Sequence, residues 1–223
     1  MKGRQLLRTW VDDEPAIDWS DFEKASEQSR DLVRRLAADR EVLGKLVRGV
    51  EHVPALMEMC ERHRLLDKVV IYDDLARGMR LRLHFSTDYH LDRPHDHRFS
   101  FTTLILRGEY AHVWHEPDSS IDPNELTVSD LKSKFMTTER EGACYTLHHS
   151  LLHTTITTQD TVSLFLRGPS EKDRSIITDR VTGRVWWRYG ETQEDKGRRA
   201  QVRMSKEAYT QMVAKAERLE VIA

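Results

Sequence analysis

The sequence has little of several features whose scarcity excludes whole classes of protein. It holds only two cysteines, Cys60 and Cys144, which are too few for a disulfide framework and favour a reducing compartment. No apolar run approaches the roughly 18 residues that a membrane span needs. The first ten residues lead into an acidic stretch without the apolar core of a signal peptide. We therefore predict a cytoplasmic protein that makes no use of a membrane.

The chain also lacks an excess of either charge. It carries 35 basic and 37 acidic side chains, for a net charge of −2, whereas a dedicated nucleic-acid binder normally has a basic excess. It contains no P-loop, no dinucleotide-binding fingerprint and no zinc-protease motif. With 223 residues, 39% of them hydrophobic, it can bury a sizeable core. These features argue against nucleic acid as a partner, and we expect the partner to be a small molecule.

The hydrophobic pattern divides the chain into three parts. Residues 1–67 follow a helical period, with a capping box predicted at Ser20–Glu23, a helix after Asp39 and another from Pro54 through His63. Residues 68–190 alternate with period 2 and form the predicted β domain. Residues 191–223 form an extension whose final helix begins after Ser205.

Short strands separated by turns are typical of a small barrel or sandwich. The strands are predicted at residues 68–72, 79–85, 99–107, 110–115, 153–158, 161–167 and 185–189. The polar stretch 116–142, which contains Pro117 and Pro123, is predicted to be an insert with a short helix near 129–134, acting as a lid or an ornament.

Histidine is unevenly distributed. Nine of the 11 histidines lie between residues 84 and 153, and imidazole is the commonest metal ligand. In a strand, the side chains of His95 and His97 would point to the same side, so that both could reach one ion. His112 and His115 are expected to pack or to face solvent. A second reading, in which His90-Leu-Asp92 begins a 2-oxoglutarate oxygenase site, remains open.

The spacing around these histidines resembles the cupin superfamily. Its first motif is His-x-His, three or four residues, Glu, six residues and Gly, and here His95-Asp-His97 is followed at those spacings by Phe101 and Gly108. Its second motif places a Gly eleven residues before the last metal-binding His, as Gly142 precedes His153. The resemblance implies a mainly β, jelly-roll-like cupin barrel and a metal site of His95, His97 and His153. His149 is the alternative to His153.

Phe101 replaces the glutamate that most cupins use as a ligand. Three neutral imidazoles would leave a divalent metal with its full charge and with open positions. The sequence is similar in this respect to the cysteine dioxygenase type, which Ser100 and the run Thr161–Pro169 also resemble. The His and Tyr that this family carries on its penultimate strand fall near Phe165 and Arg167 and are not reproduced. The resemblance implies Fe(II), with Zn(II) and Ni(II) as alternatives.

Alternation also directs several other side chains toward the metal. Phe101 and Arg107 share the face of the two histidines, and Arg82 and Arg167 lie on further inward rows. A forked guanidinium suits a carboxylate, so we expect Arg82, Arg107, Arg167 and Phe101 to bind a carboxylate-bearing substrate. The alternative is that the arginines pair with Asp96, Glu109 or Asp160, or lie at strand ends in solvent.

Three functions follow from these residues. The first is a mononuclear Fe(II) oxygenase that acts on a small amino- or thiol-carboxylic acid. The second is a zinc cupin that catalyses an isomerisation or rearrangement without dioxygen. The third is a cupin that binds a small molecule without turning it over. The helices at both ends would suit a homodimer.

Overall fold

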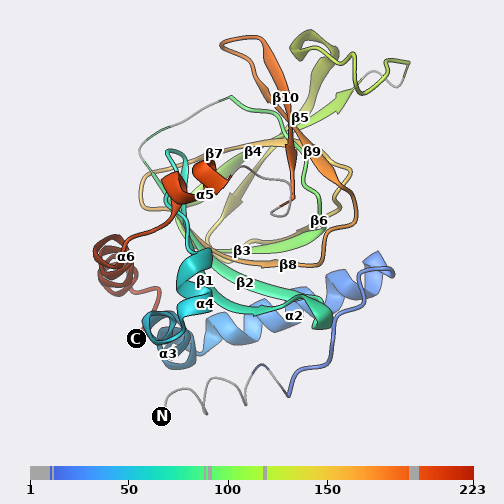
Figure 1. Ribbon diagram of the computed structural model, residues 1–223. Coiled ribbons are helices and arrows are strands. Elements are labelled where there is room, and N and C mark those ends of the chain that lie inside the picture. The colour runs from blue at the N-terminus through green and yellow to red at the C-terminus, as the bar shows by residue number, and fades with distance from the viewer. Residues whose placement is uncertain (1–10, 12, 88, 90–91, 118–119, 191–195) are drawn as a thin grey trace.

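The structure, a computed structural model, describes residues 11, 13–87, 89, 92–117, 120–190 and 196–223 (Figure 1). Its α-helices are α2 Phe22–Ala38, α3 Arg40–Gly49, α4 Pro54–Met59, α5 Lys196–Val202 and α6 Lys206–Arg218. Its strands are β1 Leu66–Asp74, β2 Met79–Ser86, β3 Phe101–Arg107, β4 Glu109–Pro117, β5 Leu131–Arg140, β6 Cys144–Leu147, β7 Leu152–Thr157, β8 Val162–Arg167, β9 Arg174–Asp179 and β10 Arg184–Tyr189.

The strands pair antiparallel in three sheets. The largest has the order β1-β2-β8-β3-β6, a second has the order β5-β4-β7, and β9 and β10 form a hairpin. Figure 1 shows the second sheet and the hairpin above the five-stranded sheet, with α2 and α3 beneath it. The predicted fold class is confirmed as mainly β and jelly-roll-like, with helices at both ends. Among the described residues the sheets remain separate, so the barrel is not closed.

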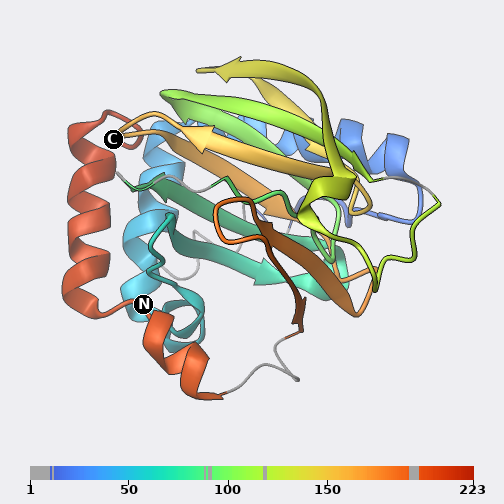
Figure 2. The ribbon, with the colours of Figure 1, turned by 90° about the horizontal axis from the view of Figure 1, so that it is seen from above.

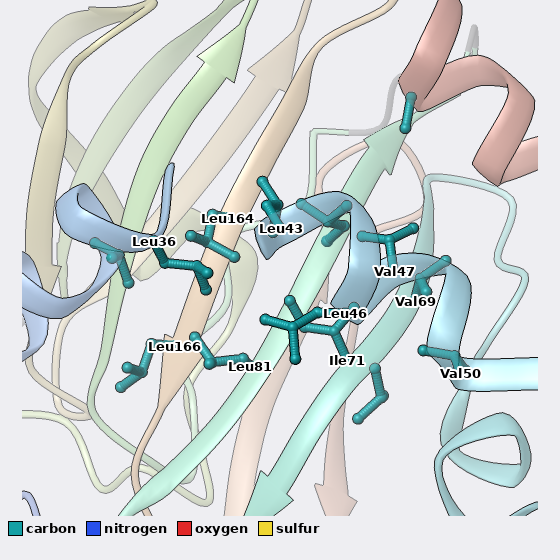
Figure 3. Close-up of a cluster of buried hydrophobic side chains, with 14 of the residues drawn as sticks. Leu36, Leu43, Leu46, Val47, Val50, Val69, Ile71, Leu81, Leu164 and Leu166 are labelled. Atoms are coloured by element: carbon teal, nitrogen blue, oxygen red, sulfur yellow. The ribbon is translucent and has the colours of Figure 1, made fainter. Parts of the chain in front are cut away.

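The main hydrophobic core lies between the five-stranded sheet and the helices. Alternation along β2 sends Met79, Leu81, Leu83 and Phe85 to this face, each at most 1% exposed. Leu164 and Leu166 of β8 join them, and the helices contribute Leu36, Leu43 and Val47, among others (Figure 3). This packing explains why α2 and α3 form, since short helices need a buried apolar face to be stable.

The C-terminal helix α6 closes one side of this core against α3 (Figure 2). Ser205 caps it by accepting a hydrogen bond from the backbone N–H of Ala208. Tyr209 donates its hydroxyl to the Val47 carbonyl, and Arg48 of α3 pairs with Glu217 at 2.8 Å. The end of the chain is thus tied to the helical layer, and Lys215 also pairs with Asp160 in the turn between β7 and β8 at 2.9 Å.

Three local predictions differ from the structure. The N-cap of α2 is Asp21, whose carboxylate accepts from the Lys24 N–H, and not Ser20. Helix α4 ends at Met59, well before His63. In the stretch 116–142, a 3-10 turn at Val128–Asp130 precedes β5, which pairs with β4 along its whole length. The C-terminal part of the expected insert, Leu131–Arg140, is therefore a strand of the second sheet.

Both glycines of the motif spacing adopt a positive φ. Gly108 joins β3 to β4 at φ 78°, and a Cβ there would lie 2.4 Å from Thr161 Oγ1. Gly142 joins β5 to β6 at φ 86°. Glycine is required at the first position by both conformation and space, and at the second by conformation. No helix in the described ranges is both long and apolar enough to cross a membrane.

Candidate metal centre and its cavity

Three histidines from two distant segments converge on one point. His95 and His97 precede β3, and His153 lies on β7. The backbones of His95 and His153 bridge the segments through two hydrogen bonds of 2.9 Å. One ring nitrogen from each histidine lies within 4.8 Å of the others, and the Nε2 atoms of His97 and His153 are 2.9 Å apart. The predicted trio is therefore brought together, although His95 and His97 lie in an irregular segment and not in a strand.

Hydrogen bonds decide which nitrogen faces the centre. The Nδ1–H of His95 donates to the Arg93 carbonyl at 2.8 Å, which leaves its Nε2 as the ligand atom. The Nδ1 of His153 is 2.7 Å from the Nε2 of His112, so His153 likewise presents Nε2. Partners of this kind on the far nitrogen are typical of metal-binding histidines.

Burial favours the neutral form of the three imidazoles. Burial lowers the pKa of His95, and burial together with the neighbouring histidines lowers the pKa of His97 and His153 well below the ordinary value. A neutral imidazole can ligate without first losing a proton. Three such nitrogens, with no carboxylate, suit a borderline divalent ion such as Fe(II), Zn(II) or Ni(II).

His149 belongs to a different group. Its Nδ1 lies 3.0 Å from Glu171 and 3.3 Å from the Ser100 hydroxyl. With the adjacent His148 it forms a second, more exposed cluster of potential ligands. The structure thus places His153, and not His149, beside His95 and His97. The described residues do not include His90, so the reading that began at this residue falls outside them.

A cavity of about 420 Å³ adjoins the three histidines. Its wall includes Arg82, Arg167 and Phe101, which were expected to bind substrate, and Arg80 and His84 from the inward face of β2. Arg107 is exposed at the end of β3 and does not line it. A register shift between Ile105 and Arg107 in the pairing of β3 with β8 breaks the alternation on which that prediction depended.

Aromatic rings lie between His97 and Arg167 in the cavity wall. The Phe101 ring lies 4.6 Å from that of His97 and is stacked on Phe165, also at 4.6 Å. His84 stacks on the other side of Phe165 at 4.4 Å. The Arg167 guanidinium lies over the Phe99 ring at 4.3 Å. An apolar layer therefore lies between the candidate ligands and the cationic end of the cavity.

The cationic end contains an uncompensated charge. Arg167 is 5% exposed, and its strand neighbour across β2 is Arg80. Burial, with Arg82, Arg80 and Arg98 nearby, lowers the pKa of Arg167 to about 8. Its Nε has no hydrogen-bond partner among the described residues. Such a group favours an anion in the cavity.

The alternative of structural pairing holds for only part of this cluster. Arg80 forms an ion pair with Asp73 of β1. Asp96, which was considered as a partner for the inward arginines, instead binds Lys172. No ion pair of Arg167 is found within the described residues.

Sequence reasoning missed His112. It is fully buried, which agrees with the packing alternative, but its hydrogen bond with His153 was not expected. Its role depends on the pairing of β4 with β7, which sets His112 opposite Thr155, diagonal to His153. The one available signal was its place in a histidine-rich strand.

Comparison with known proteins gives distant likenesses in structure alone. No protein-family model matches the chain, and no curated protein matches it. An RmlC-like cupin from Shewanella frigidimarina is 9% identical, over 50% of this chain and 85% of its own, with a TM-score of 0.34. KdgF from a Halomonas species is 9% identical, over 49% and 84%, with a TM-score of 0.34. The hydroquinone 1,2-dioxygenase PnpCD, solved with Cd²⁺ and 4-hydroxybenzonitrile, is 15% identical, over 49% and 68%, with a TM-score of 0.37.

All three identities are 15% or less and all three TM-scores are 0.37 or less. These likenesses therefore carry no argument about what the protein binds or does. The resemblance to the cysteine dioxygenase type stays a prediction.

Proposed function

We propose that the protein is a mononuclear metal enzyme, an Fe(II) oxygenase acting on a small amino- or thiol-carboxylic acid. The observation that carries the proposal is the convergence of three neutral imidazoles at the wall of a cavity whose other end is cationic. A metal and an anionic substrate could thus occupy one enclosed space.

The residues of the cavity would have two roles, metal binding and substrate binding. His95, His97 and His153 would hold the ion through Nε2. Arg167, assisted by Arg82, would bind the substrate carboxylate, because a buried guanidinium gains most from a bidentate anion. When bound, Fe(II) would supply the redox chemistry through which dioxygen oxidises an organic acid.

The aromatic layer would position the substrate between these two ends. Phe99, Phe101 and Phe165 lie between the histidines and Arg167. They offer no proton and would make the space beside the ion apolar. The substrate would therefore place its carboxylate at the arginines and extend an apolar portion past the rings toward the metal.

A zinc enzyme is the second candidate, because an all-imidazole donor set suits zinc as well as iron. Zinc would act as a Lewis acid in an isomerisation or rearrangement, with the same arginines holding the acid. The two candidates differ in their need for dioxygen.

The test is oxygen uptake by the Fe(II)-loaded protein with a panel of small amino and thiol acids. We expect uptake with at least one acid, loss of at least tenfold in Arg167→Leu, and no loss in Arg107→Leu, whose side chain lies outside the cavity. Turnover that continues without dioxygen in the zinc-loaded protein would select the second candidate. No turnover with either metal would leave a binding protein.

A further inference from the structure

We propose that Glu139 and His112 form a hydrogen-bonded chain behind His153 that positions this ligand and supplies, indirectly, the carboxylate that the metal site lacks. The inference rests on the proposed metal site. Neither residue would touch the ion or the substrate, so both are positioning residues.

The three side chains lie in line across the second sheet. The Nδ1 of His153 is 2.7 Å from the Nε2 of His112. The Nδ1 of His112 in turn lies 3.5 Å from Oε1 of Glu139 on β5. The His112 side chain is fully buried and that of Glu139 is 13% exposed, so little solvent screens the chain.

Two buried polar atoms of the His153–His112–Glu139 series have no hydrogen-bond partner among the described residues. They are His112 Nδ1 and Glu139 Oε2, and they belong to side chains that face each other. A buried polar atom left unpaired is costly. A hydrogen bond between His112 Nδ1 and the Glu139 carboxylate would remove this cost. Oε1 of Glu139 also accepts from the Thr137 hydroxyl, so a rotation of the carboxylate that brings Oε2 toward His112 Nδ1 would provide this hydrogen bond.

A metal at the three histidines would fix the direction of the chain. Once Nε2 of His153 binds the ion, the proton of that ring must sit on Nδ1 and be donated to Nε2 of His112. The proton of His112 must then sit on its own Nδ1, where the Glu139 carboxylate is the acceptor at hand. Every donor then has an acceptor, and each ring is held in one tautomer.

This arrangement places a negative charge near the metal site, where Phe101 stands in place of a carboxylate ligand. The candidate ligands contribute no negative charge, and a carboxylate ligand would have contributed one. Glu139 places a carboxylate two imidazoles away, where it makes His153 a more basic ligand and attracts the ion through a medium of low dielectric. A simpler role for His112 is packing, because its ring stacks on Trp114 at 4.2 Å.

Titration with Co(II), a spectroscopic substitute for Fe(II), separates the two roles. We expect His112→Phe, which keeps the stacking, to weaken Co(II) binding about 10- to 100-fold and to change the cobalt absorption spectrum. His112→Gln offers an acceptor oxygen to His153 and should recover much of the affinity. Glu139→Gln should weaken binding in the same direction but by less.

The matched control is His115→Phe. His115 is also a buried histidine of β4, but its Nε2 pairs with the Thr154 hydroxyl. We expect its Co(II) affinity to stay within about threefold of the wild type. Wild-type affinity and spectrum in His112→Phe and Glu139→Gln would overturn the chain and leave the metal site standing. A wild-type protein that binds no Co(II) at all would overturn both the chain and the proposed function.

Discussion

The two faces of the five-stranded sheet are built from the same strands and yet differ in almost every respect. On β2, Leu81 and Leu83 point to the helices, and each is fully buried among apolar side chains. The residues between and beside them, Arg82 and His84, point into the cavity. Adjacent positions on one strand thus serve opposite purposes.

The helical face is built mainly of apolar side chains, whereas the cavity face holds several buried polar ones. Burial of apolar side chains stabilises the first face, at roughly 25 cal/mol per Å². On the second, Nε2 of His84 and Nε of Arg167 are buried without a hydrogen-bond partner in the described part of the chain. Sites that bind ligands commonly carry such a cost, which the rest of the fold offsets. Variants on the two faces should therefore behave differently.

Acid should have the largest effect, because it acts on the buried histidines around the cavity and in the second sheet and not on the apolar helical face. Burial lowers the pKa of His84, His97 and His153 well below the ordinary value, and that of His112 to about 3. Below about pH 6.5 the unfolded chain binds protons that the folded metal-free protein does not. The free energy of unfolding should then fall by about 1.4 kcal/mol per pH unit for each such histidine, and by about 5.5 kcal/mol per unit for the four together.

Urea denaturation of the metal-free protein at pH 7.5, 6 and 5 measures this fall. His84→Phe should remove about one quarter of it, because one of the four histidines no longer titrates. An unfolding free energy that is constant between pH 7 and pH 5 would contradict the view that these rings are held neutral.

The next largest effect should be the loss of stability when a buried side chain of the helical face is truncated. Leu164→Ala removes a fully buried side chain from the core and should lower the unfolding free energy by about 3 kcal/mol. Metal content should not change. Ser163→Ala, one residue away on the cavity face, removes only a hydroxyl that pairs with Tyr110 and should cost about 1 kcal/mol. Equal losses for the two variants would contradict the separation of the faces.

Arg167→Leu should have the smallest effect on stability and the opposite sign. Replacing an uncompensated buried cation with an apolar side chain should raise the unfolding free energy by about 1 kcal/mol, while substrate binding is lost. Thermal unfolding without ligand, with Arg107→Leu beside it, would show this. A clear destabilisation by Arg167→Leu would mean that this arginine is a structural residue and not a substrate anchor.

The sequence predicts those features that depend on local alternation or fixed spacing. The opposed rows of β2 and the trio His95, His97 and His153 are of this kind. Strand β5 was not predicted, because its residues from Lys132 to Thr138 are all exposed and neither face carries an apolar row. Arg107 was wrongly predicted to face the cavity, because the alternation of residues in the sequence does not reveal a bulge.

The partners of a site residue are harder to predict than the residue itself. The contact of His112 with His153 depends on the register between β4 and β7, and that of His112 with Glu139 on the pairing of β4 with β5. Register is set by long-range packing, which a single sequence does not reveal.

The most direct test is the number of metal ions bound per chain after anaerobic loading with Fe(II) and removal of excess. We expect one tightly bound ion per chain in the wild type, none in His97→Ala and one in His149→Ala. The opposite outcome, in which His149→Ala loses the ion and His97→Ala keeps it, would place the metal at His148, His149 and Glu171. That result would contradict the site on which the proposed function depends.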